Sequence, residues 1–242
     1  MHMDAKRLVA HRGDNTHYPE NSYAGIESAL RAGALFIEFD IQMNADQSLI
    51  VFHDDSFKRT TNKNGSIFES DDVTIKAISA HEPRRFGEQH YPTHIPHLSE
   101  ILNLLSNFPK AHAFVEIKVQ SLKYWGVKTV MDKLLNALKK HQAQTTIISF
   151  STEALQYTKE HSQLQTGFVF LNYNNKTEQH AKKLNPTYLI CSHLIIPEKN
   201  LWKGDWLWMV YSLNHVKQMQ KAFKRKDIEL FETDDIRRML EA

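Results

Sequence analysis

The sequence predicts an α/β fold, a closed (β/α)8 barrel of the TIM type with a small insertion after its second strand. Short apolar runs alternate with amphipathic segments along the chain, which is typical of parallel strands joined by helical crossovers. Setting aside one strand that returns in a hairpin, we count eight strands, each followed by a helix. Eight such units in 242 residues favour a closed barrel over an open doubly wound sheet.

The first strand and helix are marked by the residues at their ends. Residues 7–10 (RLVA) form a short apolar run, and the polar residues His11 and Arg12 follow it. No Gly-rich dinucleotide or phosphate-loop signature comes after this strand. We expect a helix to begin at the Asn-Ser pair at 21–22, since both residues are good N-caps, and to stop at Gly33, which suits a C′ position.

A predicted hairpin over residues 35–54 is the central feature of the sequence. Its outgoing strand holds two acids, Glu38 and Asp40, which share one face because side chains alternate along a strand. A turn at 44–48 leads into a returning strand, which should bring His53 back near the two acids. On the hairpin alone, two interpretations are equally good: acids that bind a divalent cation, and acids of an exposed edge strand that face water.

A polar segment of about residues 54–94 follows the hairpin. Its periodicity is weak, and we interpret it as an inserted subdomain or a long loop on one rim of the barrel. The remaining strands are expected at 112–119, 145–150, 166–171, 187–191, 205–211 and 227–231. The helices are expected to begin near 98 and to cover 122–141, 152–161, 176–184, 214–224 and 234–240, with a helical turn at Pro197. Without a linker or repeat, one domain over residues 1–242 is the simplest interpretation.

The composition excludes several classes of protein. The formal net charge is +2 without a long basic block, which gives no case for nucleic-acid binding. No apolar run is long enough for a transmembrane segment or, near the N-terminus, for a signal peptide. The single cysteine, Cys191, cannot form an intrachain disulfide, and we expect a small buried residue there. Together these features predict a cytoplasmic protein.

Polar residues gather at the predicted carboxyl ends of neighbouring strands, where barrel enzymes build their sites. The set contains two histidines, three carboxylates and two cations: His11, His53, Glu38, Asp40, Glu116, Arg12 and Lys118. These residue types suit the cleavage of a phosphodiester. The carboxylates can hold Mg²⁺ or Ca²⁺ against the anionic substrate, the two cations can hold its free oxygens, and the histidines can share the proton transfers.

Several motifs in the same order resemble the glycerophosphodiester phosphodiesterase family. They are HRG at 11–13, PEN at 19–21, IEFD at 37–40, FHDDSFKRTTN at 52–62, IPHLSEIL at 95–102 and VEIK at 115–118, with weaker matches at 148–150, 211–214 and 232–234. Each motif alone is weak, but the ordered set covers nearly the whole chain and is highly specific.

The resemblance implies a metal-dependent barrel enzyme that hydrolyses glycerophosphodiesters to sn-glycerol 3-phosphate and an alcohol. It implies that His11 and His53 are catalytic and that the metal ligands are Glu38, Asp40 and Glu116. It also implies that the 2-hydroxyl of the substrate is the nucleophile, so that no protein nucleophile is needed. The expected partner is a small-molecule glycerophosphodiester, and the sequence leaves a homo-oligomer open.

The chain departs from the family pattern in three places. Tyr211 stands where the family usually has tryptophan, and we expect this side chain to line the substrate pocket or to pack in the barrel. The proline that usually follows the final Thr-Asp is absent, since Asp235 follows Asp234. The last strand, 227–234 (DIELFETD), is unusually acidic.

Other polar and aromatic residues are interpreted mainly as structural. Glu20 and Asn21 should cap the first helix or orient Arg12, and ion pairs with the acids are the competing interpretation for Arg12 and Lys118. His193 should be a satisfied histidine at the rim. Six histidines should lie at the surface: His81, His90, His94, His141, His161 and His180. Three tryptophans should pack in the core or between helices and sheet: Trp202, Trp206 and Trp208.

Two rival functions are left open. A phospholipase D-like phosphodiesterase on the same barrel would cleave lysophospholipids, although the lack of disulfides and of a signal peptide argues against a secreted enzyme of that kind. The other rival is a non-catalytic barrel that only binds phosphoesters, and the intact set of histidines and acids speaks against it.

Overall fold

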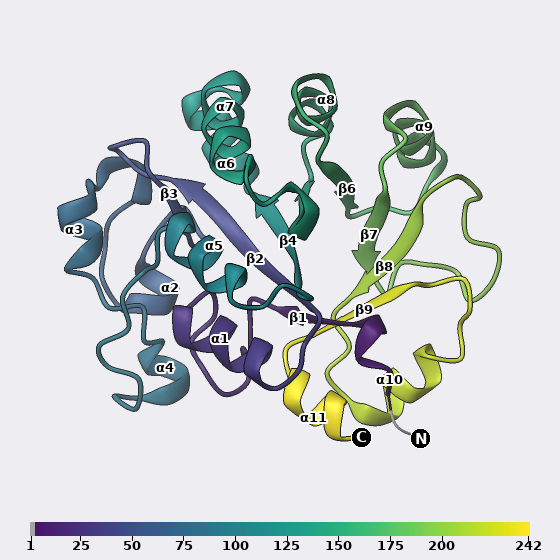
Figure 1. The fold of residues 1–242 in the computed structure, drawn as a ribbon, viewed down its shortest axis with the longest axis horizontal. Helices are drawn as coiled ribbons and strands as arrows, with labels where there is room; N and C mark the ends of the chain where they lie inside the picture. The colour runs from purple at the N-terminus through teal and green to yellow at the C-terminus, as the bar shows by residue number, and fades with distance from the viewer. Residues whose placement is uncertain (1–2) are drawn as a thin grey trace.

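The structure, a computed structural model, describes residues 3–242 and confirms the predicted (β/α)8 barrel (Figure 1). Eight parallel strands form one ring, which closes because β1 pairs with both β2 and β9. In ring order the strands are β1 (Leu8–His11), β2 (Phe36–Met43), β4 (His112–Ile117), β5 (Thr145–Ser149), β6 (Gln165–Phe170), β7 (Tyr188–Ser192), β8 (Leu207–Tyr211) and β9 (Leu230–Thr233).

Helices surround this ring of strands (Figure 1). They are α1 (Tyr23–Arg31), α5 (Leu98–Ser106), α6 (Val119–Trp125), α7 (Val127–Leu138), α8 (Thr152–His161), α9 (Asn175–Leu184), α10 (Val216–Ala222) and α11 (Ile236–Glu241). Short 3-10 helices lie at Ala5–Arg7, Ile67–Glu69 and Gln142–Gln144. Helix α1 begins as predicted, since the Ser22 hydroxyl accepts a hydrogen bond from the Gly25 N–H at 3.0 Å.

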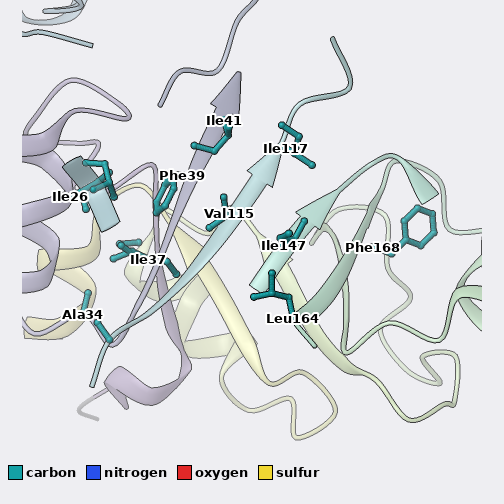
Figure 2. Packing of buried hydrophobic residues seen from close by; sticks show 14 of the residues in the cluster. Ile26, Ala34, Ile37, Phe39, Ile41, Val115, Ile117, Ile147, Leu164 and Phe168 are labelled. Atoms are coloured by element: carbon teal, nitrogen blue, oxygen red, sulfur yellow. The ribbon is translucent and has the colours of Figure 1, made fainter. Parts of the chain in front are cut away.

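Alternation along the strands divides the buried apolar side chains into two layers. The outer layer packs between the strands and the helices, and Figure 2 shows five of its members from β2 and β4: Ile37, Phe39, Ile41, Val115 and Ile117. The inner layer fills the ring: Val9, Phe114, Ile148, Val169, Tyr188, Ile190, Met209 and Leu230. Because Glu38 and Asp40 alternate with the outer residues of β2, their side chains face the inside of the barrel.

The predicted hairpin is present. Strand β3 (Leu49–Val51) runs antiparallel to β2, with Val51 opposite Ile41. Beyond β3 the Phe52 N–H donates to the Asp40 carbonyl at 3.0 Å. The chain therefore stays paired with β2 as far as Phe52, which brings the next residue, His53, close to the end of β2.

Between β3 and α5 the chain forms three short helices, α2 (Lys58–Thr61), α3 (Asp72–Lys76) and α4 (Pro83–Phe86), which lie together on one side of the barrel (Figure 1). They enclose a small apolar cluster of their own: Ile50, Phe52, Phe57, Ile67, Ile75, Ala80 and Ile95. The weak periodicity of the polar segment does not reveal this cluster, because its members are spread from Ile50 to Ile95.

Two predicted helices differ from those observed. The helix expected at 122–141 is divided into α6 and α7, because Gly126 adopts a φ of 84° and interrupts the helical backbone. The helical turn expected at Pro197 is absent, and the described connection from β7 to β8 has turns and irregular backbone instead. Strand β7, the sixth of the eight strands in the ring, is therefore not followed by a helix.

One of the six histidines predicted at the surface is buried. His81 is 7% exposed, its ring packs edge-on against Tyr91 with centroids 5.0 Å apart, and its Nδ1 lies 2.9 Å from the Ser79 hydroxyl. The other five are half-buried or exposed. The tryptophans pack as predicted, since Trp202 stacks on Tyr173 and the buried Trp206 and Trp208 belong to the outer layer. Cys191 is buried.

Within residues 3–242, every helix is too short or too polar to reach across a lipid bilayer.

Gly13, in the loop after β1, is expected to tolerate substitution poorly. It has a φ of 85°, and a Cβ there would lie 2.7 Å from the backbone carbonyl carbon of Gly25 in α1. We expect Gly13→Ala to lower the free energy of unfolding by about 2–4 kcal/mol, from left-handed backbone plus overpacking. Gly33→Ala is the control: its φ is 100° but nothing lies within 4 Å. Equal losses in chemical denaturation would show that the contact with α1 is unimportant.

Candidate active site

Polar side chains meet inside the mouth of the barrel, at the carboxyl ends of its strands. His11 of β1 is the register partner of Glu38 of β2, and Asp40 is the register partner of Glu116 of β4. Glu232 of β9 and Lys118, the residue after β4, are also buried there. Strand pairing therefore brings together side chains that are widely separated in the sequence.

Three carboxylates form the centre of this group. Glu38, Asp40 and Glu116 each offer an oxygen, and these atoms lie within 4.8 Å of one another. Glu38 and Asp40 are 2% and 1% exposed. Burial and the charge of Asp40 raise the pKa of Glu38 well above its ordinary value. Burial also raises the pKa of Glu116, against the opposing charge of Lys118. The group is thus under strong like-charge repulsion.

Asp40 is the best supported of the three. Its carboxylate lies 3.1 Å from Arg12 Nε and 3.2 Å from Lys118 Nζ, and it accepts a hydrogen bond from Asn21 Nδ2 at 2.8 Å. Lys118 also donates to Glu116 at 2.6 Å. Burial alone would raise the pKa of Asp40, but Arg12 and Lys118 outweigh it and hold that pKa well below its ordinary value. Asp40 therefore stays ionised.

The loop after β1 holds the acids through its backbone as well. The Arg12 N–H donates to Glu38 Oε2 at 3.1 Å, and the Asn21 N–H donates to the Arg12 carbonyl at 3.1 Å. Asn21 Oδ1 accepts from the Asp40 N–H at 3.0 Å. Arg12 and Asn21 have φ values of 55° and 56°. Such backbone costs a residue other than glycine roughly 1–3 kcal/mol and is concentrated at functional sites.

His11 is anchored by Asp234, the residue that follows the last strand, β9. Its Nδ1 lies 2.5 Å from Asp234 Oδ1, and its Nε2 lies 4.0 Å from Glu38 Oε2. Burial lowers the pKa of His11, but the charge of Glu232 and the hydrogen bond to Asp234 outweigh burial and raise it to about 9. The short contact with Asp234 leaves Nε2 as the nitrogen that faces the carboxylates.

His53 is anchored in the same way from the other end of the hairpin. Its Nδ1 lies 2.5 Å from Asp54 Oδ1. Arg59 donates to Asp54 at 2.7 Å and, through both terminal nitrogens, to Glu20 at 2.6 and 2.7 Å. Glu20 in turn accepts from Arg12 Nη1 at 3.0 Å. An unbroken chain of ion pairs therefore joins His53 to the guanidinium beside Asp40.

All seven predicted polar residues are at the mouth, but sequence patterns missed four others. Asp54 and Asp234 hold the two histidines, Arg59 links the loops, and Glu232 is 3% exposed inside the barrel. Burial raises the pKa of Glu232 to about 7. A signal was available for all four, since Asp54 and Arg59 lie within the motif at 52–62, and Glu232 and Asp234 within the motif at 232–234.

The remaining predicted residues have structural contacts. Tyr211 ends β8 half-buried against the inner apolar layer, and burial raises its pKa to about 12. Its backbone carbonyl accepts from the His193 N–H at 2.8 Å, so His193 is tied to the rim. Ser22, not Glu20, caps the first helix, and Glu20 orients Arg12 instead.

The carboxylates at the centre fit a divalent cation. Glu38 Oε1 is buried and has no hydrogen-bond partner among residues 3–242. A buried carboxylate oxygen without a partner is costly, and a cation would satisfy it. Because Glu38, Asp40 and Glu116 offer oxygens only, the set suits hard cations such as Mg²⁺ and Ca²⁺.

Comparison with known sequences identifies close similarities. The profile of the glycerophosphoryl diester phosphodiesterase family matches residues 11–227. A glycerophosphodiester phosphodiesterase of Caldanaerobacter subterraneus is 33% identical over 155 residues, which cover 63% of this chain and 61% of that protein. Another, from Bacillus subtilis, is 33% identical over 161 residues, which cover 61% of this chain and 53% of that protein. The match thus spans between half and two thirds of these relatives.

Solved structures share the fold. A phosphodiesterase of Oleispira antarctica, solved in complex with the product sn-glycerol-3-phosphate, matches with a TM-score of 0.85 at 19% identity, over 97% of this chain and 95% of that one. A glycerophosphodiester phosphodiesterase of Agrobacterium tumefaciens matches with a TM-score of 0.80 at 21% identity, over 98% of this chain and 100% of that one.

The role of Asn21 is testable without disturbing the backbone. Asn21→Gly keeps a residue suited to positive φ and removes both side-chain hydrogen bonds to Asp40. We expect the affinity for Mg²⁺ or Ca²⁺, measured by calorimetry, to fall roughly 10–100-fold, the usual effect of losing a group that orients a ligand. Asn62→Gly is the matched control, since Asn62 is exposed with a φ of 58°. Unchanged affinity in Asn21→Gly would contradict the role given to Asn21.

Proposed function

The chain belongs to the glycerophosphoryl diester phosphodiesterase family, and from this premise we propose that it hydrolyses glycerophosphodiesters to sn-glycerol 3-phosphate and an alcohol. Glycerophosphocholine and glycerophosphoethanolamine are the proposed substrates. The observation that carries the proposal is the pair of histidines beside the buried carboxylates. His11 and His53 each have Nδ1 within 2.5 Å of an aspartate, which directs both Nε2 atoms away from that partner.

Glu38, Asp40 and Glu116 are the proposed ligands of a divalent cation, Mg²⁺ or Ca²⁺. When bound, the cation would neutralise the phosphodiester and polarise its oxygens. Asn21 and the backbone of Arg12 keep two of the three ligands in place before any ion arrives. Preorganisation of this kind reduces the reorganisation needed during the reaction.

The two histidines are proposed to divide the proton transfers. A carboxylate that accepts from Nδ1–H leaves Nε2 free to take or give a proton. One histidine would take the proton of the attacking hydroxyl, and the other would protonate the departing alcohol oxygen. Asp234 and Asp54 are positioning residues in this scheme, because each lies against Nδ1 of its histidine and so holds the imidazole ring in its orientation.

Arg12 and Lys118 are proposed to hold the free phosphate oxygens. Both are ion-paired with Asp40, so their structural role is real. Both also keep unused donors. Lys118 contacts two acids with a group that has three protons, and within residues 3–242 the one side-chain hydrogen bond of Arg12 leaves from Nη1, not from Nη2. Tyr211 is proposed to line the pocket that receives the substrate.

The rival functions have less support from the structure. A barrel that only binds phosphoesters would not need two histidines anchored by aspartates. Specificity for a lysophospholipid would need apolar surface for its acyl chain, whereas the groups gathered around the three carboxylates at the mouth are charged. A cytoplasmic location, a single domain and the oligomeric state stay predictions.

Turnover of defined substrates tests the proposed function. With Mg²⁺ or Ca²⁺, we expect the pure protein to release sn-glycerol 3-phosphate from glycerophosphocholine or glycerophosphoethanolamine, and to act much more slowly on lysophosphatidylcholine. Removal of metal with a chelator should abolish turnover, and added metal should restore it. Absence of product from every glycerophosphodiester would refute the enzymatic proposal, and preference for lysophosphatidylcholine would favour the phospholipase D-like rival.

Substitution of His53 distinguishes a role in proton transfer from a role in metal binding. We expect His53→Ala to lower kcat roughly 10²–10⁴-fold, the usual contribution of a general acid or base, while Mg²⁺ affinity stays near the wild-type value. Glu116→Gln should instead lower the affinity for Mg²⁺, because it removes a proposed metal ligand. Excess metal should therefore partly restore its turnover. His180→Ala, on the exposed face of α9, is the control. Loss of metal affinity in His53→Ala would overturn this division of roles.

A further inference from the structure

The mouth of the barrel contains one carboxylate that the proposed reaction does not use. Glu232 lies on β9 opposite Val9 and points into the barrel. It is 3% exposed, and its Oε1 atom has no hydrogen-bond partner in the part of the chain that the structure describes. A buried carboxylate oxygen in this state carries a desolvation cost that no hydrogen bond offsets, although the charges of His11 and Arg12 act on the group from farther away.

The fixed cations leave this charge unbalanced. Arg12 and Lys118 both pair with Asp40, and Lys118 also pairs with Glu116. Arg12 pairs with Glu20 as well, so these two cations are engaged by Asp40, Glu116 and Glu20. Glu38 receives the Arg12 backbone N–H at Oε2, while its Oε1 atom is buried and, within residues 3–242, without a partner. The excess negative charge is therefore located on Glu38 and Glu232.

His11 supplies the third donor beside these two acids. One ligand atom each from His11, Glu38 and Glu232 lies within 4.8 Å of the other two. His11 Nδ1 is held by Asp234, and Nε2 lies 4.0 Å from Glu38. A histidine that is oriented by a carboxylate through its other nitrogen is the usual form of a histidine metal ligand.

We propose that His11, Glu38 and Glu232 form a second cation site, adjacent to the Glu38–Asp40–Glu116 site, and that it takes a transition metal such as Zn²⁺. One imidazole nitrogen and two carboxylates are a mixed donor set that Zn²⁺ accepts and that Mg²⁺ and Ca²⁺ disfavour. Glu38 belongs to both sets, and a carboxylate can bridge two ions a few ångströms apart. The side chain of His11 is 21% exposed, which leaves the site open to solvent.

An ion in this site would occupy Nε2 of His11, the atom proposed to transfer a proton. Zn²⁺ would therefore inhibit the Mg²⁺-loaded enzyme. This effect on turnover rests on the proposed function, whereas binding of Zn²⁺ by the three side chains does not.

Calorimetry of the whole chain saturated with Mg²⁺ tests the site. We expect the wild type to bind one Zn²⁺ tightly, and the isosteric variant Glu232→Gln to bind it roughly tenfold or more weakly with its Mg²⁺ affinity preserved. The control is Glu229→Gln, since Glu229 is exposed just before β9. Surface histidines are the same in all three proteins, so the difference between them reports the site. Zn²⁺ inhibition of turnover should weaken in parallel with binding.

A second variant guards against misfolding. Glu232→Leu removes a buried, unpaired carboxylate, so we expect a higher Tm without metal together with loss of the tight Zn²⁺ site. Absence of a tight Zn²⁺ site in the wild type, or equal Zn²⁺ affinity in the wild type and both Glu232 variants, would overturn the proposal. Zn²⁺ binding that depends on Glu232 in a protein without turnover would support the site and refute the proposed function instead.

Discussion

Repulsion among buried carboxylates is the constraint on which the rest of the barrel mouth depends. Parallel pairing brings Glu38, Asp40, Glu116 and Glu232 to the ends of adjoining strands, where water is largely excluded. Two fixed cations, Arg12 and Lys118, reduce that repulsion, and the backbone N–H of Arg12 donates to Glu38. The loop after β1 adopts a left-handed backbone at Arg12, which presents this N–H to the carboxylate. The apolar layer below gives the charges no alternative partner.

The barrel was predictable because its evidence is periodic and local. Alternation along β2 showed that Glu38 and Asp40 share a face, and the hairpin placed His53. The break at Gly126 was not predictable, since the apolar pattern continues through it and only the left-handed φ divides the helix. His81 was misjudged because its burial comes from Tyr91, ten residues away, rather than from its sequence neighbours.

Site residues were predictable where their position on a strand determined which face of the sheet their side chains occupy. They were not predictable where a contact depends on closure of the ring. Asp234 reaches His11 only because β9 pairs with β1, and the inward direction of Glu232 follows from that same register. The acidity of the last strand was visible in the sequence, but its meaning required the partner strand. Asp54 lies in a recognised motif beside His53, which marks it as a candidate, but its contact with the imidazole depends on side-chain rotamers that the motif does not show.

Arg59 has a consequence for how this barrel can evolve. It belongs to the segment between β3 and α5, yet its guanidinium joins Asp54, which holds His53, to Glu20, which holds Arg12. Replacement of the residues after Asp54 by a segment without this arginine would preserve the ring of strands, but Asp54 and Glu20 would lose the guanidinium that they share. The size and sequence of this segment can therefore diverge only in ways that still bring a positive charge to this position.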